Sequence, residues 1–195
     1  MRIGVIGVQG AITEHIASVR KALDRLGVKG EASWIRRRED LRDIAALIMP
    51  GGESTTISKL MERNGLFEEV RRLGEEGLPI MGTCAGLILL AKKVLGAIPG
   101  QRFLELLDIE VIRNAYGRQV DSFEAPIKLV FSEKPFQGVF IRAPRISKIY
   151  GRARPLAYYR DEVVGVEQDN LIGLTFHPEL SDDTRIHEYF IEKIR

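Results

Sequence analysis

Short apolar runs alternate along the first half of the chain with longer segments whose apolar residues recur every three or four positions. Residues 3–8 form the first run, and a helical stripe from Ile12 to Leu26 follows it and stops at Gly27. This alternation predicts parallel strands joined by crossover helices. We therefore expect an open α/β sheet, mixed but largely parallel and flanked by helices, with ligands bound at the carboxyl ends of the strands.

The rest of the chain continues the pattern and then changes to strands and turns. No linker, repeat or low-complexity segment divides it, so we expect one domain over residues 1–195. Further strands are expected over 32–35, 45–49, 78–81, 109–112, 125–131, 139–141, 156–160, 163–167 and 171–176, and further helices over 54–64, 66–76, 84–94 and 183–194.

Composition excludes several classes of protein. The 195 residues have a formal net charge of +2, without the clustered cations that nucleic acid requires. The apolar stretch over residues 78–91 is too short for a membrane helix, so we expect no membrane partner. A single cysteine allows no internal disulfide, which is typical of a reducing compartment. We expect a cytoplasmic protein.

The strongest local motif is the stretch from Gly82 to Gly86, which has Cys84 at its centre and lies where an apolar strand turns into a helix. Two glycines at this spacing allow the sharp turn of a nucleophile elbow and expose the central side chain. The helix that follows directs its N-terminal dipole at the sulfur and favours a thiolate. A lone cysteine is more often a small buried apolar residue, but this context favours a nucleophile.

A thiolate nucleophile needs a base, and the chain has three histidines. His15 and His187 lie in expected helices, where we expect exposed or partly buried structural side chains. His177 follows a strand and therefore lies at the same sheet edge as Cys84. Glu179 comes two residues later, and in an extended stretch its side chain points to the same side and can orient the ring. The three residues predict a Cys-His-Glu triad.

Acyl transfer also needs donors for an oxyanion. The backbone N–H of Ala85 follows the nucleophile, and the loop from Pro50 to Glu53 offers bare backbone amides at the end of another strand. This loop lacks the Lys of a phosphate-binding loop, and the glycines at 4, 7 and 10 have the wrong spacing for a dinucleotide fingerprint. We therefore expect no cofactor and no metal.

Three motifs together resemble the class I glutamine amidotransferases: the stretches 82–87, 50–54 and 177–179. The stretches 7–11, 113–119, 122–124 and 140–144 narrow the resemblance to the glutaminase subunits of pyridoxal 5'-phosphate synthases. The resemblance covers residues 4–190. It implies a flavodoxin-like fold and a glutaminase that converts L-glutamine to L-glutamate and ammonia through a glutamyl thioester.

The resemblance also implies roles for individual residues. It implies Cys84, His177 and Glu179 as the triad and the backbone N–H groups of Gly52 and Ala85 as the oxyanion donors. Gln9 is expected near the mouth of the site. The expected contacts to glutamine come from Gly51, Gly52, Glu53, Arg113, Ile141 and Arg142, and the sequence leaves open which of them contacts which end of the substrate.

The resemblance further implies a partner. It implies a synthase (lyase) subunit in a multi-subunit hetero-oligomer, which receives the ammonia and joins it to pentose and triose phosphates. Docking is expected to bring the loop around Gly51 and Gly52 into its working conformation. One alternative is the glutaminase subunit of another pathway, such as imidazole glycerol phosphate synthase. A second is a redox-sensing protein, which would not need the oriented base at His177.

Overall fold

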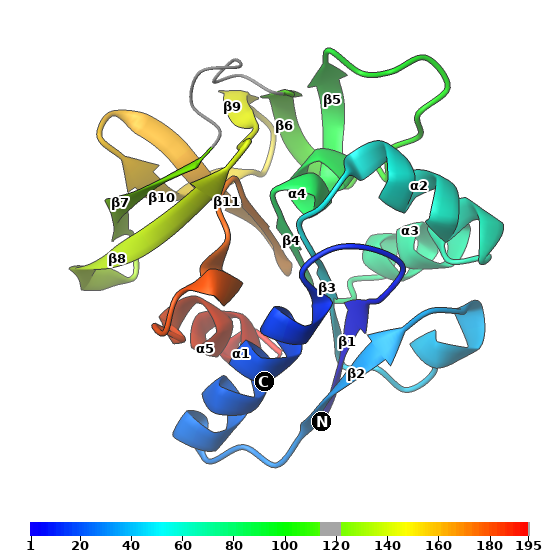
Figure 1. Ribbon diagram of the computed structural model, residues 1–195, viewed down its shortest axis with the longest axis horizontal. Helices are drawn as coiled ribbons and strands as arrows, with labels where there is room; N and C mark the ends of the chain where they lie inside the picture. Colours follow the sequence, from blue (N-terminus) through cyan, green and yellow to red (C-terminus); the bar gives the residue numbers. More distant parts are fainter. Residues whose placement is uncertain (114–121, 195) are drawn as a thin grey trace.

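The computed structural model describes residues 1–113 and 122–194, and a mixed sheet of nine strands forms its centre (Figure 1). In spatial order the strands are β2 (Glu31–Ile35), β1 (Arg2–Ile6), β3 (Ala46–Met49), β4 (Ile80–Thr83), β12 (Leu171–Leu174), β11 (Glu162–Gln168), β10 (Arg154–Tyr159), β7 (Ser122–Leu129) and β8 (Ser132–Ile141). The four pairings that join β2, β1, β3, β4 and β12 are parallel, and the other four pairings of the sheet are antiparallel. The expected mixed α/β sheet is therefore confirmed, with half of its pairings parallel.

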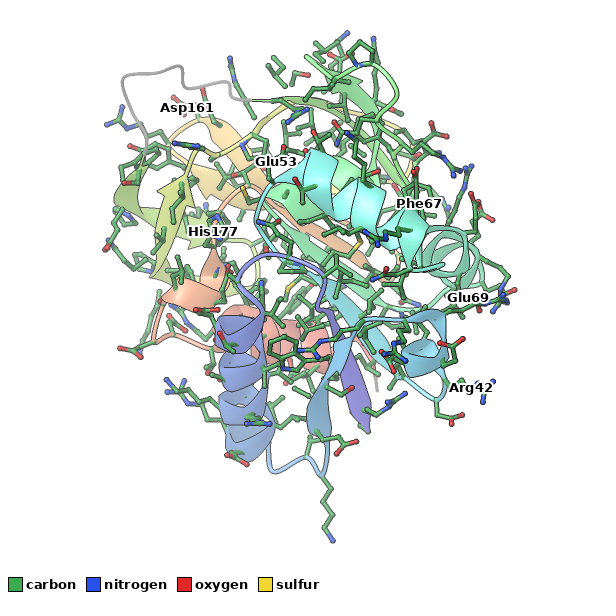
Figure 2. All side chains as sticks on the ribbon, turned by 45° about the vertical axis from the view of Figure 1, so that its right-hand side comes forward. Arg42, Glu53, Phe67, Glu69, Asp161 and His177 are labelled. Carbon is green, nitrogen blue, oxygen red and sulfur yellow. The ribbon has the colours of Figure 1, made fainter. Side chains whose placement is uncertain are left out.

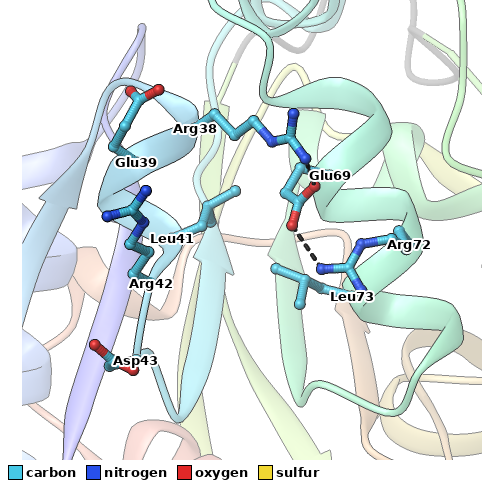
Figure 3. A pocket seen from close by; sticks show the side chains of 8 residues that line it. All are labelled: Arg38, Glu39, Leu41, Arg42, Asp43, Glu69, Arg72 and Leu73. Atoms are coloured by element: carbon cyan, nitrogen blue, oxygen red, sulfur yellow. Dashed lines mark hydrogen bonds and ion pairs between the residues drawn. The ribbon is translucent and has the colours of Figure 1, made fainter.

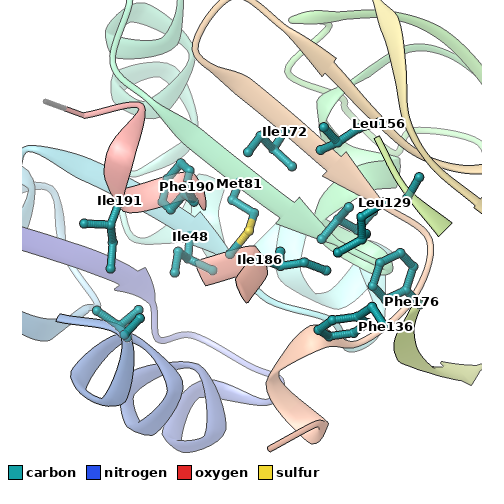
Figure 4. Close-up of a cluster of buried hydrophobic side chains, with 14 of the residues drawn as sticks. Ile48, Met81, Leu129, Phe136, Leu156, Ile172, Phe176, Ile186, Phe190 and Ile191 are labelled. Atoms are coloured by element: carbon teal, nitrogen blue, oxygen red, sulfur yellow. The ribbon is translucent and has the colours of Figure 1, made fainter. Parts of the chain in front are cut away.

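Helices cover both faces of the parallel half, which explains why its strands are continuous apolar runs. Ile48 of β3 packs in the core beneath α1 and α5, whereas its neighbours Leu47 and Met49 pack in the core on the other face. Figure 4 shows the first of these cores, where Phe190 lies beside Met81. The helices are α1 (Ile12–Leu26), α2 (Ser54–Arg63), α3 (Phe67–Glu75), α4 (Ala85–Leu90) and α5 (Arg185–Glu192), with short 3₁₀ helices η1 (Arg38–Leu41) and η2 (Pro178–Leu180).

A second sheet of three strands, which the sequence did not predict, lies beside the first. It consists of β5 (Ala91–Leu95), β6 (Leu107–Ile112) and β9 (Arg145–Ile149). The helix expected over 84–94 is therefore wrong beyond Leu90. Residues of β5 pair with β6, where Lys93 Nζ lies 2.7 Å from Glu110 Oε2. Tertiary pairing overrides the helical preference of this apolar run.

Most expected elements are present with shifted ends. β1 ends at Ile6, β12 ends at Leu174, and β4 begins two residues later than expected. β8 is much longer than the expected strand over 139–141 and forms a hairpin with β7. Among the described residues, no helix combines the length and apolar character needed to cross a membrane.

Candidate active site

Cys84 lies at a strained turn between β4 and α4. Its φ of 48° lies in the left-handed region, which a residue with a Cβ atom adopts only where its surroundings fix it. The backbone N–H of Cys84 donates to the carbonyl oxygen of Leu174, at 2.8 Å. A Cβ atom on Gly82 would lie 2.7 Å from the carbonyl oxygen of Gly86, and one on Gly86 would collide with that of Met49. Close backbone contacts therefore require both glycines of the elbow.

Cys84 is buried, with 6% of its surface exposed, so the expectation that the elbow exposes its side chain is wrong. Its Sγ lies 3.8 Å from the carbonyl oxygen of Ile141, to which the thiol donates, and it interacts electrostatically with His177. α4 has six residues, fewer than expected, so its dipole acts on the sulfur less than the sequence suggested.

His177 and Glu179 come together although the expected extended stretch between them is wrong. Pro178 begins η2 instead, because its fixed φ suits the first position of a helical turn. Nδ1 of His177 still lies 2.7 Å from Oε1 of Glu179. The backbone N–H of His177 donates to Val139 of β8, at 2.8 Å, which fixes the base from the opposite side.

The members of the triad shift the pKa values of His177 and Glu179. Burial by itself would lower the pKa of His177, but its interactions with Cys84 and Glu179 outweigh burial and raise that pKa to about 10. Burial raises the pKa of Glu179, yet the facing His15 and His177 outweigh it and hold the pKa of the carboxyl below its usual value. An imidazolium between a sulfur and a buried carboxylate is an arrangement suited to nucleophilic catalysis.

The loop after β3 passes directly over His177. A Cβ atom on Gly51 would lie 2.9 Å from His177 Nδ1, so only glycine fits there without displacing the ring. The carbonyl oxygen of Gly51 accepts a hydrogen bond from the N–H of Ala11, at 3.3 Å. Oε1 of Gln9 accepts from the N–H of Glu53, at 3.0 Å. The segment before α1 therefore holds this loop. Ala85 is the first residue of α4, so its N–H has no acceptor within the helix.

Two residues expected to bind glutamine form an ion pair with each other. Nη2 of Arg113 lies 3.2 Å from Oε1 of Glu53, whose Oε2 accepts from the N–H of Thr56 and caps α2. Figure 2 shows Glu53 at the start of α2. Sequence reasoning missed Gln101, whose Oε1 accepts from Nη1 of Arg113, at 2.9 Å, and whose Nε2 donates to Ser54. No local motif identifies Gln101, because it lies in an irregular loop.

The remaining predicted residues lie at the end of β8 or outside the described part of the chain. Ile141 and Arg142 are exposed where β8 ends, and Arg142 has a left-handed φ of 43°. Ile141 lies against Cys84 through its carbonyl oxygen. The diagnostic stretch 113–119 lies outside the described residues after Arg113.

The expectation that His15 and His187 are exposed or partly buried is wrong. Both are fully buried, and Nε2 of His15 lies 3.3 Å from Oε2 of Glu179. One signal was available in the sequence: His15 lies three residues after Ile12 and four before Val19, on the apolar stripe that α1 buries.

A hollow of about 460 Å³ between η1 and α3 contains none of these residues (Figure 3). Two of its cations are paired: Arg38 lies 2.9 Å from Glu69, and Arg72 lies 2.6 Å from the same carboxylate. Exposed ion pairs of this kind are an ordinary protein surface. The hollow adds nothing to the candidate active site.

Comparison with known proteins identifies the family. A pyridoxal 5'-phosphate synthase subunit PdxT from Thermococcus onnurineus is 69% identical over 99% of this chain and 98% of its own length, and one from Pyrococcus horikoshii is 60% identical over the whole of both chains. A crystal structure of a glutamine amidotransferase superposes with a TM-score of 0.88 at 45% identity and covers 98% of both chains. A second glutamine amidotransferase, from Thermotoga maritima, shares the fold alone, with a TM-score of 0.60 at 16% identity over all of this chain and 84% of its own. The model of the SNO glutamine amidotransferase family matches residues 5–195, and the chain belongs to that family.

Proposed function

We propose that this protein hydrolyses L-glutamine to L-glutamate and ammonia as the glutaminase subunit of a pyridoxal 5'-phosphate synthase. One observation carries the proposal: Cys84 at the strained elbow interacts electrostatically with His177, whose Nδ1 lies 2.7 Å from the buried carboxylate of Glu179. A nucleophile, a base and an orienting group in this order are typical of acyl transfer. The full-length similarity to subunits named PdxT supports the pathway.

The proposed reaction begins when the thiolate of Cys84 attacks the side-chain amide carbon of glutamine and forms the C–S bond. The carbonyl electron pair moves to oxygen, which the N–H groups of Gly52 and Ala85 stabilise. Because Nδ1 of His177 is bound to Glu179, its Nε2 gives the proton to the amide nitrogen as the C–N bond breaks and ammonia leaves. The same nitrogen then takes a proton from water, whose oxygen attacks the thioester. Glutamate leaves and the thiolate is restored.

Arg113 and Glu53 are the proposed groups for the α-carboxylate and the α-ammonium of glutamine. Without substrate they pair with each other at 3.2 Å, so a bound amino acid exchanges one ion pair for two. Backbone groups of Gly51 and Ile141, with Arg142, complete the proposed contacts around the side-chain amide.

The proposal includes a partner because free ammonia would be protonated and diluted in bulk water. We place the protein, as one glutaminase domain over residues 1–195, in a hetero-oligomer with the synthase subunit that builds the pyridine ring from pentose and triose phosphates. Neither a membrane nor a nucleic acid takes part, and a reducing cytoplasm suits the single thiol. The alternative pathway of imidazole glycerol phosphate synthase is not favoured, because the relatives described above are named PdxT.

The test follows the amide nitrogen. The protein and its cognate synthase subunit are given amide-¹⁵N glutamine with the sugar phosphates, and the product is examined by mass spectrometry. We expect ¹⁵N in the pyridine ring. If the ¹⁵N label enters only a different acceptor, the assignment to pyridoxal 5'-phosphate synthesis is wrong. If no glutamate is released with any synthase subunit, the proposed glutaminase activity is wrong.

Cys84→Ala is the control for this test. The variant should form no thioester and transfer no label, yet it should elute with the synthase subunit in size-exclusion chromatography, since the change removes one atom from a buried side chain. Loss of the complex would contradict a purely chemical role for the sulfur.

A further inference from the structure

Two histidines that the proposed reaction does not use are buried behind the triad. His15 of α1 and His187 of α5 are both fully inaccessible, and Nδ1 of His15 lies 3.2 Å from Nε2 of His187. The other nitrogen of His15, Nε2, lies 3.2 Å from Oγ1 of Thr83 and 3.3 Å from Oε2 of Glu179. Thr83 immediately precedes Cys84. The pair therefore contacts the site through Thr83 and Glu179.

One carboxylate oxygen of Glu179 takes no part in the triad. Oε1 binds His177, whereas Oε2 is buried, makes no hydrogen bond of good geometry among the described residues, and faces Nε2 of His15. Burying a carboxylate oxygen without a hydrogen-bond donor costs free energy and raises the pKa of the carboxyl group. The imidazole N–H of His15 is positioned to offset this cost.

The hydrogen-bond pattern determines which nitrogen of each ring holds the proton. Within the described part of the chain, Nδ1 of His187 has no hydrogen-bond partner, and a buried N–H without an acceptor is rarer than an unpaired acceptor. His187 therefore donates from Nε2 to Nδ1 of His15. The proton of His15 is then on Nε2, which lies 3.2 Å from Oγ1 of Thr83 and 3.3 Å from Oε2 of Glu179.

Complete burial disfavours a charge on either ring, and Nδ1 of His15, which accepts from His187, is unprotonated. Burial lowers the pKa of His15, and burial together with the neighbouring His15 lowers the pKa of His187 to about 3. The ionisable groups that face His15 are Glu179, His177 and His187, with Glu14 beside it on α1. We propose that His15 is a positioning residue of the glutaminase site, which holds Glu179 ionised and oriented towards His177, and that His187 fixes the tautomer of His15. This inference rests on the proposed glutaminase reaction.

α1 then supports the site at two points. The N–H of Ala11, just before the helix, holds the carbonyl oxygen of Gly51, and the side chain of His15 one turn later faces Glu179. The loop that offers the oxyanion donor and the carboxylate that orients the base are thus fixed by one rigid element.

Two variants of one residue separate positioning from packing. In His15→Gln the amide N–H reaches the place of Nε2, and in His15→Asn the amide reaches only the place of Nδ1. With the synthase subunit present, we expect kcat of His15→Asn to fall roughly 10- to 100-fold, the range of one hydrogen bond to a charged group, with KM for glutamine unchanged. The acid limb of its pH profile should move up by about one unit or more, because Glu179 loses a donor. His15→Gln should keep most of the parent's kcat and leave the acid limb close to its parent position.

Ile16→Ala is the matched control, because Ile16 is the next residue of the same helix and is buried in the apolar core. It should lower the thermal unfolding midpoint and leave the acid limb where it is. Equal behaviour of His15→Asn and His15→Gln, or an unmoved acid limb in His15→Asn, would overturn the inference.

A readout without activity keeps this inference separate from the proposed reaction. The carboxyl ¹³C signal of Glu179, identified by its loss in Glu179→Gln, is titrated in the full chain alone. The pKa of Glu179 should rise in His15→Asn and stay low in His15→Gln. If the parent chain releases no glutamate, the proposed function fails while this titration still decides the role of His15. An identical titration in parent and His15→Asn would refute that role.

Discussion

At the level of single residues, the candidate site depends on a few close contacts with backbone. The glycines flanking Cys84 were predictable because a sharp strand-to-helix turn leaves no space for Cβ atoms. The requirement at Gly51 was not predictable in the same way, since it arises from the ring of His177, which is distant in the sequence.

Gly51→Ala should reduce glutaminase activity by roughly 100-fold or more, because the added methyl group would displace the His177 ring, and small displacements of reacting groups have effects of that size. Circular dichroism and the thermal midpoint should change little. Gly77→Ala, at a turn where a Cβ atom meets nothing within 4 Å, should cost some stability but leave kcat intact. Activity that survives in Gly51→Ala would contradict the placement of this loop against the base.

At the level of elements, α1 and α5 meet through His15 and His187 as well as through apolar packing. The sequence predicted both helices and their apolar stripes, because periodicity depends on local order. It did not predict β5 and β9, whose residues become strands only by pairing with β6. The buried histidine pair was missed for a similar reason: its partners come from two ends of the chain.

This pair makes the protein less stable in mild acid. The pKa of His187 is lowered from 6.5 to about 3 and that of His15 is lowered as well, so between these values the unfolded chain binds more protons than the folded one. The free energy of unfolding should therefore fall as the pH falls below 6.5, by roughly 1.4 kcal/mol per pH unit for His187, and His15 adds to the fall in the same direction. Urea unfolding between about pH 5 and 6 measures this slope. His187→Gln should make the slope smaller, and an unchanged slope in that variant would argue against a neutral buried His187.

At the level of the whole molecule, two apolar cores on opposite faces of the larger sheet hold the layers together. The sequence predicted the layered α/β arrangement from the apolar runs. It could not predict the second sheet, nor how far the antiparallel half extends, because turn residues specify hairpins but not which strands become neighbours. The candidate site depends on such long-range pairings, because Cys84 follows β4, whereas His177 follows β12 and bonds to β8.

Phe190→Ala should lower the free energy of unfolding by about 3–5 kcal/mol, because it leaves a cavity between α5 and the sheet. Chemical denaturation gives this value. The control Glu192→Ala changes an exposed residue on the same helix and should stay within about 0.5 kcal/mol of the parent. A small effect at Phe190 would mean that α5 can collapse onto the sheet without its aromatic ring.

The hydrogen bond from the N–H of His177 to Val139 joins the end of β12 to β8, the outermost strand of the larger sheet. The base therefore takes its position only after the antiparallel half of the sheet has been synthesised and closed. A chain still emerging from the ribosome has Cys84 but neither His177 nor Glu179, which follow near its end. The triad therefore assembles only after nearly the whole chain has been made.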